Sequence, residues 1–84
     1  MKKQEFKETV NEGLDRDKGI MIVKIKGAKD VNPKIVIIQG EDIKPNFKRY
    51  IKETDDNMVF KDTGDRVEDL LMTNNINELS WFIW

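Results

Sequence analysis

The chain has no cysteine and no histidine, and Ser80 is its single serine. Without cysteine it forms neither a disulfide nor a thiolate metal site. Without histidine, the Ser/His and Cys/His pairs that many enzymes use as nucleophile and base are excluded. Catalysis would have to rest on carboxylates, lysines or Tyr50, and the sequence singles out no pair of them. We therefore predict a protein that is not an enzyme and that holds no metal and no cofactor.

The sequence also has no large excess of charge of one sign and no long apolar run. The 84 residues carry 15 basic and 16 acidic side chains, for a formal net charge of −1. Proteins that bind duplex nucleic acid usually have a net basic surface, so duplex binding is not expected. No apolar run approaches the ~18 residues of a membrane helix, and the first residues do not resemble a signal peptide. We predict one domain over residues 1–84, located in the cytoplasm and without membrane contact.

The first two thirds of the chain show clear periodic patterns. Phe6, Val10 and Leu14 recur every four residues, which predicts an amphipathic helix over residues 3–16. Gly13 beside this stripe costs about 1 kcal/mol in helix propensity, and close packing of the helix on a sheet explains its presence. Gly19 is expected to close the helix in the left-handed conformation.

Two β-rich runs follow, at residues 20–26 and 34–39. The turn-forming residues 27–33 between them favour an antiparallel hairpin. Further on, Phe47, Tyr50 and Ile51 fall at helical spacing, so residues 46–54 are predicted to form a helix capped by Asn46, with a strand as the alternative.

Asp65 and Glu68 have the spacing of a capping box. They predict a helix that carries Val67, Leu70 and Leu71 on its inner face. Together these elements predict an α+β fold, in which a small, mostly antiparallel three-stranded sheet is packed by the N-terminal helix and one or two further helices.

The segment 79–84 is the most apolar of the chain and contains both tryptophans. Read as the third strand of the sheet, it has Leu79, Trp81 and Ile83 on one face and Phe82 and Trp84 on the other, and no polar face. Two interpretations remain open. Either both faces are covered by this chain, or Phe82 and Trp84 contact another molecule as an interface.

The segment 44–52 is the main candidate binding site. Lysines at i, i+4 and i+8 alternate with aromatic residues, a mixture that holds phosphates and stacks on bases. The plainer interpretation is an ordinary amphipathic helix with its aromatic residues in the core. The candidate residues for ligand or partner binding are Lys44, Phe47, Lys48, Arg49 and Lys52.

Acidic clusters offer a weaker candidate for a site. Asp15 and Asp17 do not match a calcium loop, because Gly19 is the fifth residue where the EF-hand pattern needs a glycine at the sixth. Asp55, Asp56, Asp62 and Asp65 are explained by acidic turns and helix N-caps, without a metal ion.

Three short motifs carry a resemblance to a known family. Residues 6–10 in the opening helix, Lys44-Pro45 in mid-chain, and residues 69–71 leading towards a terminal tryptophan are similar to small phage counter-defence proteins of the anti-Thoeris family. The resemblance implies an oligomeric sponge that sequesters a cyclic nucleotide signal. The chain departs from the family at residues 73–80, which separate the Asp-Leu-Leu motif from Trp81, and no ligand residue is carried over.

Lysine, isoleucine and asparagine are abundant whereas Ala28 is the single alanine, a bias that resembles phage proteins from AT-rich genomes. We therefore predict a non-catalytic phage or mobile-element protein, acting in the host cell cytoplasm. The preferred function is inhibition of a host defence or regulatory complex by protein–protein interaction. The alternatives are an oligomeric cyclic-nucleotide sponge and a nucleic-acid-binding module, and self-association into a homo-oligomer is a further possibility.

Overall fold

The computed structural model describes residues 1–29 and 31–83, and Ile83 by its backbone alone. The three strands form one antiparallel sheet in the order β2-β1-β3. The α+β class predicted from the sequence, with an N-terminal helix and two further helices, is therefore confirmed. In chain order the elements are α1 (Lys3–Asp15), β1 (Ile20–Lys26), β2 (Lys34–Gln39), the 3-10 turn η1 (Gly40–Asp42), α2 (Ile43–Glu53), β3 (Arg66–Thr73), the 3-10 turn η2 (Ile76–Glu78) and α3 (Leu79–Ile83).

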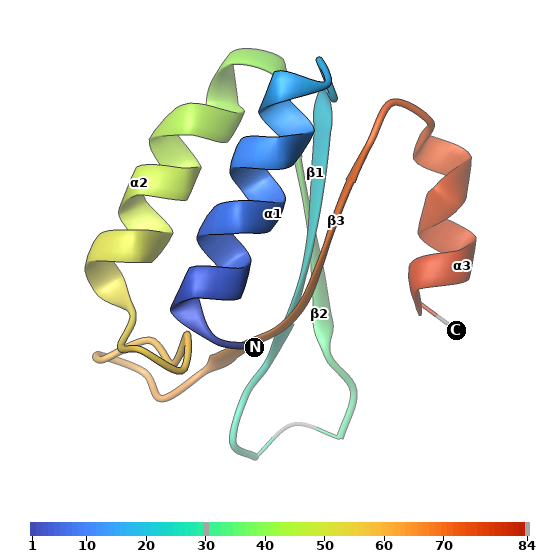
Figure 1. Ribbon diagram of the computed structural model, residues 1–84. Helices are drawn as coiled ribbons and strands as arrows, with labels where there is room; N and C mark the ends of the chain where they lie inside the picture. Colours follow the sequence, from blue (N-terminus) through green and yellow to red (C-terminus); the bar gives the residue numbers. More distant parts are fainter. Residues whose placement is uncertain (30, 84) are drawn as a thin grey trace.

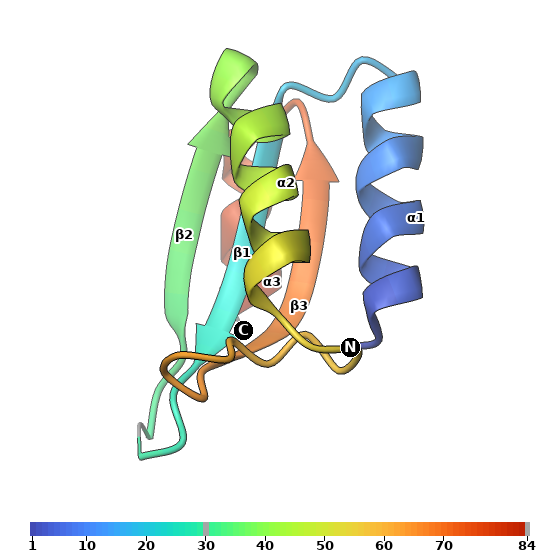
Figure 2. The same ribbon diagram turned by 90° about the vertical axis from the view of Figure 1, so that its left-hand side faces the viewer.

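The sheet lies between two unequal layers of helix. Figure 1 shows α1 and α2 side by side on one face and the short α3 on the other. The view in Figure 2 agrees, with α2 in front of the sheet, α1 towards the β3 side and α3 behind the strands. No helix among residues 1–29 and 31–83 is long and apolar enough to cross a membrane.

Helix α1 forms and packs as its pattern predicts. Phe6 and Val10 are fully buried. A Cβ atom at Gly13 would lie 2.6 Å from Cβ of Met72 on β3, so the absent side chain is what lets the helix approach the sheet. The left-handed residue after the helix is Asp17, with φ of 56°, and not Gly19 as predicted. The N–H of Gly19 instead donates to Oδ1 of Asn74, at 2.8 Å.

The predicted hairpin is confirmed at both strands. β1 and β2 pair in register from Ile20 opposite Gln39 to Ile25 opposite Lys34. Because side chains alternate across a strand, Met21 and Val23 face α1 and α2, whereas Ile22 faces the α3 side. All three side chains are fully buried.

The prediction of a helix over residues 46–54 holds in kind, and the strand alternative is wrong. Helix α2 begins at Ile43, three residues earlier than expected, and Pro45 is tolerated because it lies in the first turn. Asn46 does not cap the helix. Its amide donates to the carbonyl oxygen of Asp42 at 2.8 Å, and its Oδ1 accepts from Arg49 at 2.9 Å.

The predicted helix at residues 65–73 is wrong, because this segment forms β3. The misleading spacing of the buried residues comes from a bulge in the pairing with β1, where the register shifts between Lys24 and Ile25. In a regular strand, side chains on the same face are two residues apart, and a bulge changes this spacing. The shift brings Val67 and Leu70 onto the same covered face although they are three residues apart, with exposed fractions of 0% and 7%. Residues three apart also lie on one face of a helix, which is why the sequence pattern predicts a helix here.

The predicted terminal strand is also wrong, because residues 79–83 form α3 and β3 holds the third place in the sheet. Oδ1 of Asn75 accepts the N–H of Asn77 at 3.0 Å and starts η2, which leads directly into α3. The two predicted strand faces do not exist. The side chain of Trp81 is 84% exposed on the outer surface and is not a core residue. Trp84 lies outside the described residues.

Candidate functional site

A groove between α1 and α2, with a volume of about 330 Å³, brings together most of the residues predicted from the sequence. Each helix contributes residues at i and i+4, which lie on one helical face. Phe47 and Ile51 are half-buried and form the floor, and exposed Lys48 and Lys52 flank it. The opposite wall is formed by Lys7 and Asn11 of α1. We call these six residues the α1/α2 groove.

The floor of the groove continues into the core. The Phe47 ring stacks on Phe6, with centroids 5.8 Å apart, and Phe6 also contacts the ring of Tyr50 at 6.1 Å. The position of Phe47 is therefore fixed by core packing while its outer side remains available. Phe47 therefore contributes both to the core and to the floor of the groove.

Lys3 holds the two walls of the groove together at one end. Its Nζ donates to the carbonyl oxygens of Ile51, at 2.9 Å, and Thr54, at 2.7 Å, at the C-terminus of α2. A cation at this position also interacts favourably with the helix dipole. The backbone N–H of Lys3 donates to the carbonyl oxygen of Asp56 at 2.9 Å. The start of α1 is thus tied to the end of α2.

The charge of the groove is of one sign. Lys7, Lys48 and Lys52 line it, and no acidic residue of the described part of the chain does. The ion pairs found in the described part of the chain are Arg16–Glu12 and Arg49–Glu53, so no described carboxylate lies within 4.0 Å of these three lysines. The groove therefore presents an apolar floor between three cationic side chains without a counter-charge.

The structure separates the other two predicted residues from this groove. Lys44 belongs to the same row on α2 and is exposed, but it does not line the groove. Arg49 points to the opposite side of α2, where its guanidinium lies 5.1 Å from the centre of the Tyr50 ring and 3.9 Å from Glu53.

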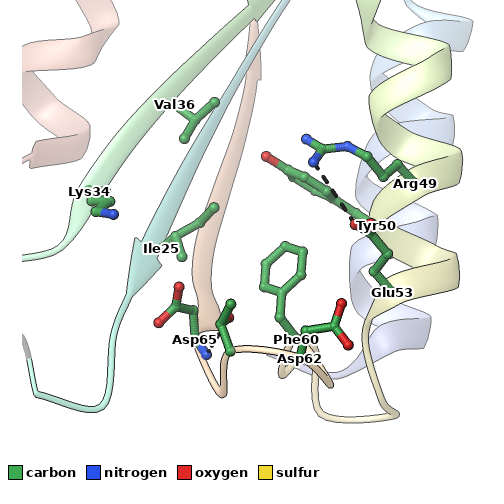
Figure 3. A pocket seen from close by; sticks show the side chains of 10 residues that line it. Ile25, Lys34, Val36, Arg49, Tyr50, Glu53, Phe60, Asp62 and Asp65 are labelled. Carbon is green, nitrogen blue, oxygen red and sulfur yellow. Dashed lines mark hydrogen bonds and ion pairs between the residues drawn. The ribbon is translucent and has the colours of Figure 1, made fainter.

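Arg49 lines a second pocket, of about 410 Å³, which we call the Tyr50 pocket. Figure 3 shows Ile25 and Val36 on the sheet, opposite the rings of Tyr50 and Phe60. These two rings meet edge to face at 5.4 Å. The charges around the pocket are of both signs. They come from Lys34, Arg49, Glu53, Asp62 and Asp65.

Two polar groups of the Tyr50 pocket that could act on a ligand, the Tyr50 hydroxyl and the Arg49 guanidinium, are both restrained. Burial raises the pKa of Tyr50, an effect that Arg49 opposes and Glu53 reinforces. The hydroxyl therefore stays protonated at neutral pH and does not serve as a base. Arg49 is already engaged by Asn46 and Glu53. With two basic and three acidic side chains of the described residues around it and a neutral phenol, this pocket shows no preference for a ligand of one charge.

The acidic turn after α2 has a local explanation. Oδ1 of Asp55 accepts the N–H groups of Val59, at 3.0 Å, and Asn57, at 2.8 Å. These two hydrogen bonds, that of Val59 first, lower the pKa of Asp55. Over residues 1–29 and 31–83, no three acidic side chains are placed to hold a metal ion together.

The α3 side of the sheet carries Phe82, one of the two residues that the sequence suggested for an interface. Phe82 is half-buried, with its ring centre 5.1 Å from Nζ of Lys24 on β1. Trp81 and Phe82 line a shallow depression with Leu71 and Glu78. Trp84, the other residue that the sequence predicts for this interface, lies outside the described residues.

Sequence reasoning missed Lys7 and Asn11, because the wall that they form depends on how α1 packs beside α2. A signal existed in their i, i+4 spacing next to the apolar stripe of the first helix. Comparison with known proteins adds nothing to this geometry. No protein-family model, no curated protein and no solved structure matches the chain.

Proposed function

We propose that the protein is a non-catalytic binding domain that contacts another protein through the α1/α2 groove. The observation that carries this proposal is the set of three lysines, Lys7, Lys48 and Lys52, around an apolar floor that no carboxylate of the described residues lines. A segment that is both acidic and apolar complements this surface. An amphipathic helix or turn with acidic residues beside its apolar face is the partner chemistry that fits best.

The physical basis is the pairing of two modest effects. Apolar side chains of the partner would cover Phe47 and Ile51 and gain about 25 cal/mol for each Å² removed from water. Carboxylates placed near Lys48 and Lys52 would steer association and fix the orientation of the segment, although exposed ion pairs add only about 0–1 kcal/mol each. Binding should therefore weaken with salt without being abolished.

We further propose that this binding inhibits a host defence or regulatory complex, as a phage or mobile-element protein would do from the host cytoplasm. The composition bias and the short motifs that resemble phage counter-defence proteins support this biological setting. Small size and the lack of histidine and cysteine support occupation of a target over its chemical modification.

A cyclic nucleotide is the second candidate ligand of the same groove. The half-buried Phe47 ring offers a stacking surface, and Lys7, Lys48 and Lys52 offer phosphate contacts. The amide of Asn11 would supply a hydrogen bond to a base edge. Extended nucleic acid ranks third, because the net charge of −1 and the restricted basic area provide few phosphate contacts.

The test compares two charge reversals of equal size on the intact protein. Lys48→Glu with Lys52→Glu reverses the groove, whereas Lys44→Glu with Lys29→Glu reverses two exposed lysines outside it. The probe is an 18-residue synthetic helix with glutamates beside a leucine and phenylalanine face. We expect tight binding to lose at least a factor of about 10, or about 1.4 kcal/mol, in the groove variant alone.

Chemical-shift mapping and cyclic dinucleotides complete this design. The acidic helix should shift the amides of Lys7, Phe47 and Ile51, and a sequence-scrambled peptide of equal charge should not. Equal weakening in both double variants would reduce the effect to net charge and contradict the proposal. Binding of a cyclic dinucleotide without binding of the peptide would favour the sponge, which ligand-induced stabilisation in thermal unfolding would also reveal.

A further inference from the structure

The two edges of the sheet differ in their free hydrogen-bonding groups. The N–H of Gly40 donates to the carbonyl oxygen of Gly19 at 2.9 Å, directly beyond the pair Ile20–Gln39. Antiparallel pairs alternate between hydrogen-bonded and non-hydrogen-bonded positions. The backbone groups of Ile35, Ile37 and Gln39 therefore point away from β1. The carbonyl of Gln39 accepts the first hydrogen bond of η1, because Gln39 is the N-cap of that turn. No other loop or side-chain hydrogen bond from the described residues reaches these groups, so the N–H of Gln39 and both backbone groups of Ile35 and Ile37 are free.

The β3 edge is blocked by its own side chains. Applied to β1 and β3, the same alternation directs the backbone of Leu70 outward. Oδ1 of Asp69 accepts this outward N–H at 2.8 Å. The register shift beside Ile25 and the charges of Glu68 and Asp69 further disfavour pairing with another strand. None of these features occurs from Ile35 to Gln39, a regular and uncharged stretch.

The charges at the two ends of β2 indicate which strand it pairs with. Lys34 lies at the start of the strand, and Glu41 and Asp42 follow its end. In an antiparallel pair of identical strands, the basic end of each lies beside the acidic end of the other. A second copy of the chain therefore complements both ends at once, with apolar residues between them. Ile37 is 40% exposed at the middle of this stretch.

We propose that two copies of the chain pair through β2 in antiparallel orientation, with Ile37 on the two-fold axis, and form one continuous six-stranded sheet. Ile37 then lies opposite the partner's Ile37, and Ile35 lies opposite the partner's Gln39. In this register all three outward-facing residues of each strand find backbone partners. This interface goes beyond the proposed binding function, because the α1/α2 groove is not part of it.

The test uses the position on the axis, where each side chain faces its own copy. Ile37→Lys and Ile37→Glu each place like charges opposite one another, whereas a mixture of the two variants places opposite charges there. Sedimentation equilibrium should give a species of twice the 9.9 kDa chain mass for the unmodified protein. Each variant alone should be monomeric, and their equimolar mixture should recover the dimer.

Controls separate the edge from other surfaces. Glu68→Lys on β3 should leave the dimer unchanged, and circular dichroism should show that every variant is folded. In the dimer, amide hydrogen exchange at Ile35, Ile37 and Gln39 should slow as the chain concentration rises.

Three results would overturn the proposal. The first is a monomer at every concentration up to about 1 mM, the weak end of measurable association. The second is a dimer that survives both charged variants, which would place the interface elsewhere, for example at Trp81. The third is a mixture of the two variants that fails to associate, which would exclude the register centred on Ile37.

Discussion

The two faces of the sheet are covered to very different degrees. Beneath α1 and α2, Met21, Val23 and Val67 are fully buried, and the helices that cover them have 13 and 11 residues. On the opposite face α3 has five residues, and Ile37 is 40% exposed. The covered face provides most of the apolar burial that stabilises the fold. On the other face, the described residues leave apolar surface uncovered, Ile37 included.

The largest expected effect is on the covered face. Phe6→Ala removes a fully buried ring that contacts Phe47 and Tyr50, and should lower the free energy of unfolding by about 3–5 kcal/mol. Such a loss is a large part of the total stability of a small domain. Urea unfolding followed by circular dichroism measures it. A loss below about 1 kcal/mol would contradict the role of this face as the main core.

A smaller effect is expected where α1 approaches β3. Gly13→Ala gains about 1 kcal/mol in helix propensity but places a methyl group 2.6 Å from Cβ of Met72. The net result should be a destabilisation of about 1–3 kcal/mol, the usual cost of overpacking. The pair Gly13→Ala with Met72→Gly serves as the control, since glycine removes the Cβ of residue 72 and with it the clash. If the double variant loses as much as the sum of the two single variants, the close contact is not the cause.

Alkaline pH should lower the free energy of unfolding through Tyr50, which packs on the covered face. Burial raises the pKa of Tyr50 above its ordinary value of 10.0, so the folded protein favours the neutral phenol. This contribution to stability is complete below pH 10 and is lost as the pH rises through the folded pKa. Tyr50 is the single tyrosine, so tyrosinate absorbance reports on it alone. Identical titration curves in native buffer and in urea would contradict the prediction.

The smallest effect is expected on the α3 side. Trp81→Ala removes a side chain that is 84% exposed, and the free energy of unfolding should change by no more than about 0.5 kcal/mol. Thermal and urea unfolding provide the measurement. A loss as large as that of Gly13→Ala would show that Trp81 is covered in solution and that the two faces differ less than the structure indicates.

The fold could be predicted from the sequence where local pattern and tertiary environment agree. In α1 and in the hairpin, the residues that recur at helix or strand spacing are the residues that become buried. At β3 they disagree, because the bulge beside Ile25 places Val67 and Leu70 on one face at a helical spacing. The segment from Leu79 is apolar at every spacing, so its pattern does not distinguish a strand from a helix.

The site could be predicted in part for a similar reason. Phe47, Lys48 and Lys52 were identified because they lie on neighbouring faces of one helix. Arg49 was grouped with them by sequence proximity, although it lies across the helix and contacts Tyr50. Lys7 and Asn11 belong to another helix, and only the packing of α1 beside α2 brings them to the groove.

The strand order β2-β1-β3 also has a consequence during synthesis. Strand β1 pairs with β2 soon after the hairpin leaves the ribosome, but its other side is completed only when β3 has been made. At about 5–20 residues per second, the central strand has one open side for roughly a few seconds. Lys24 and Lys26 lie on β1 itself. Their charges would disfavour pairing between nascent chains during this interval.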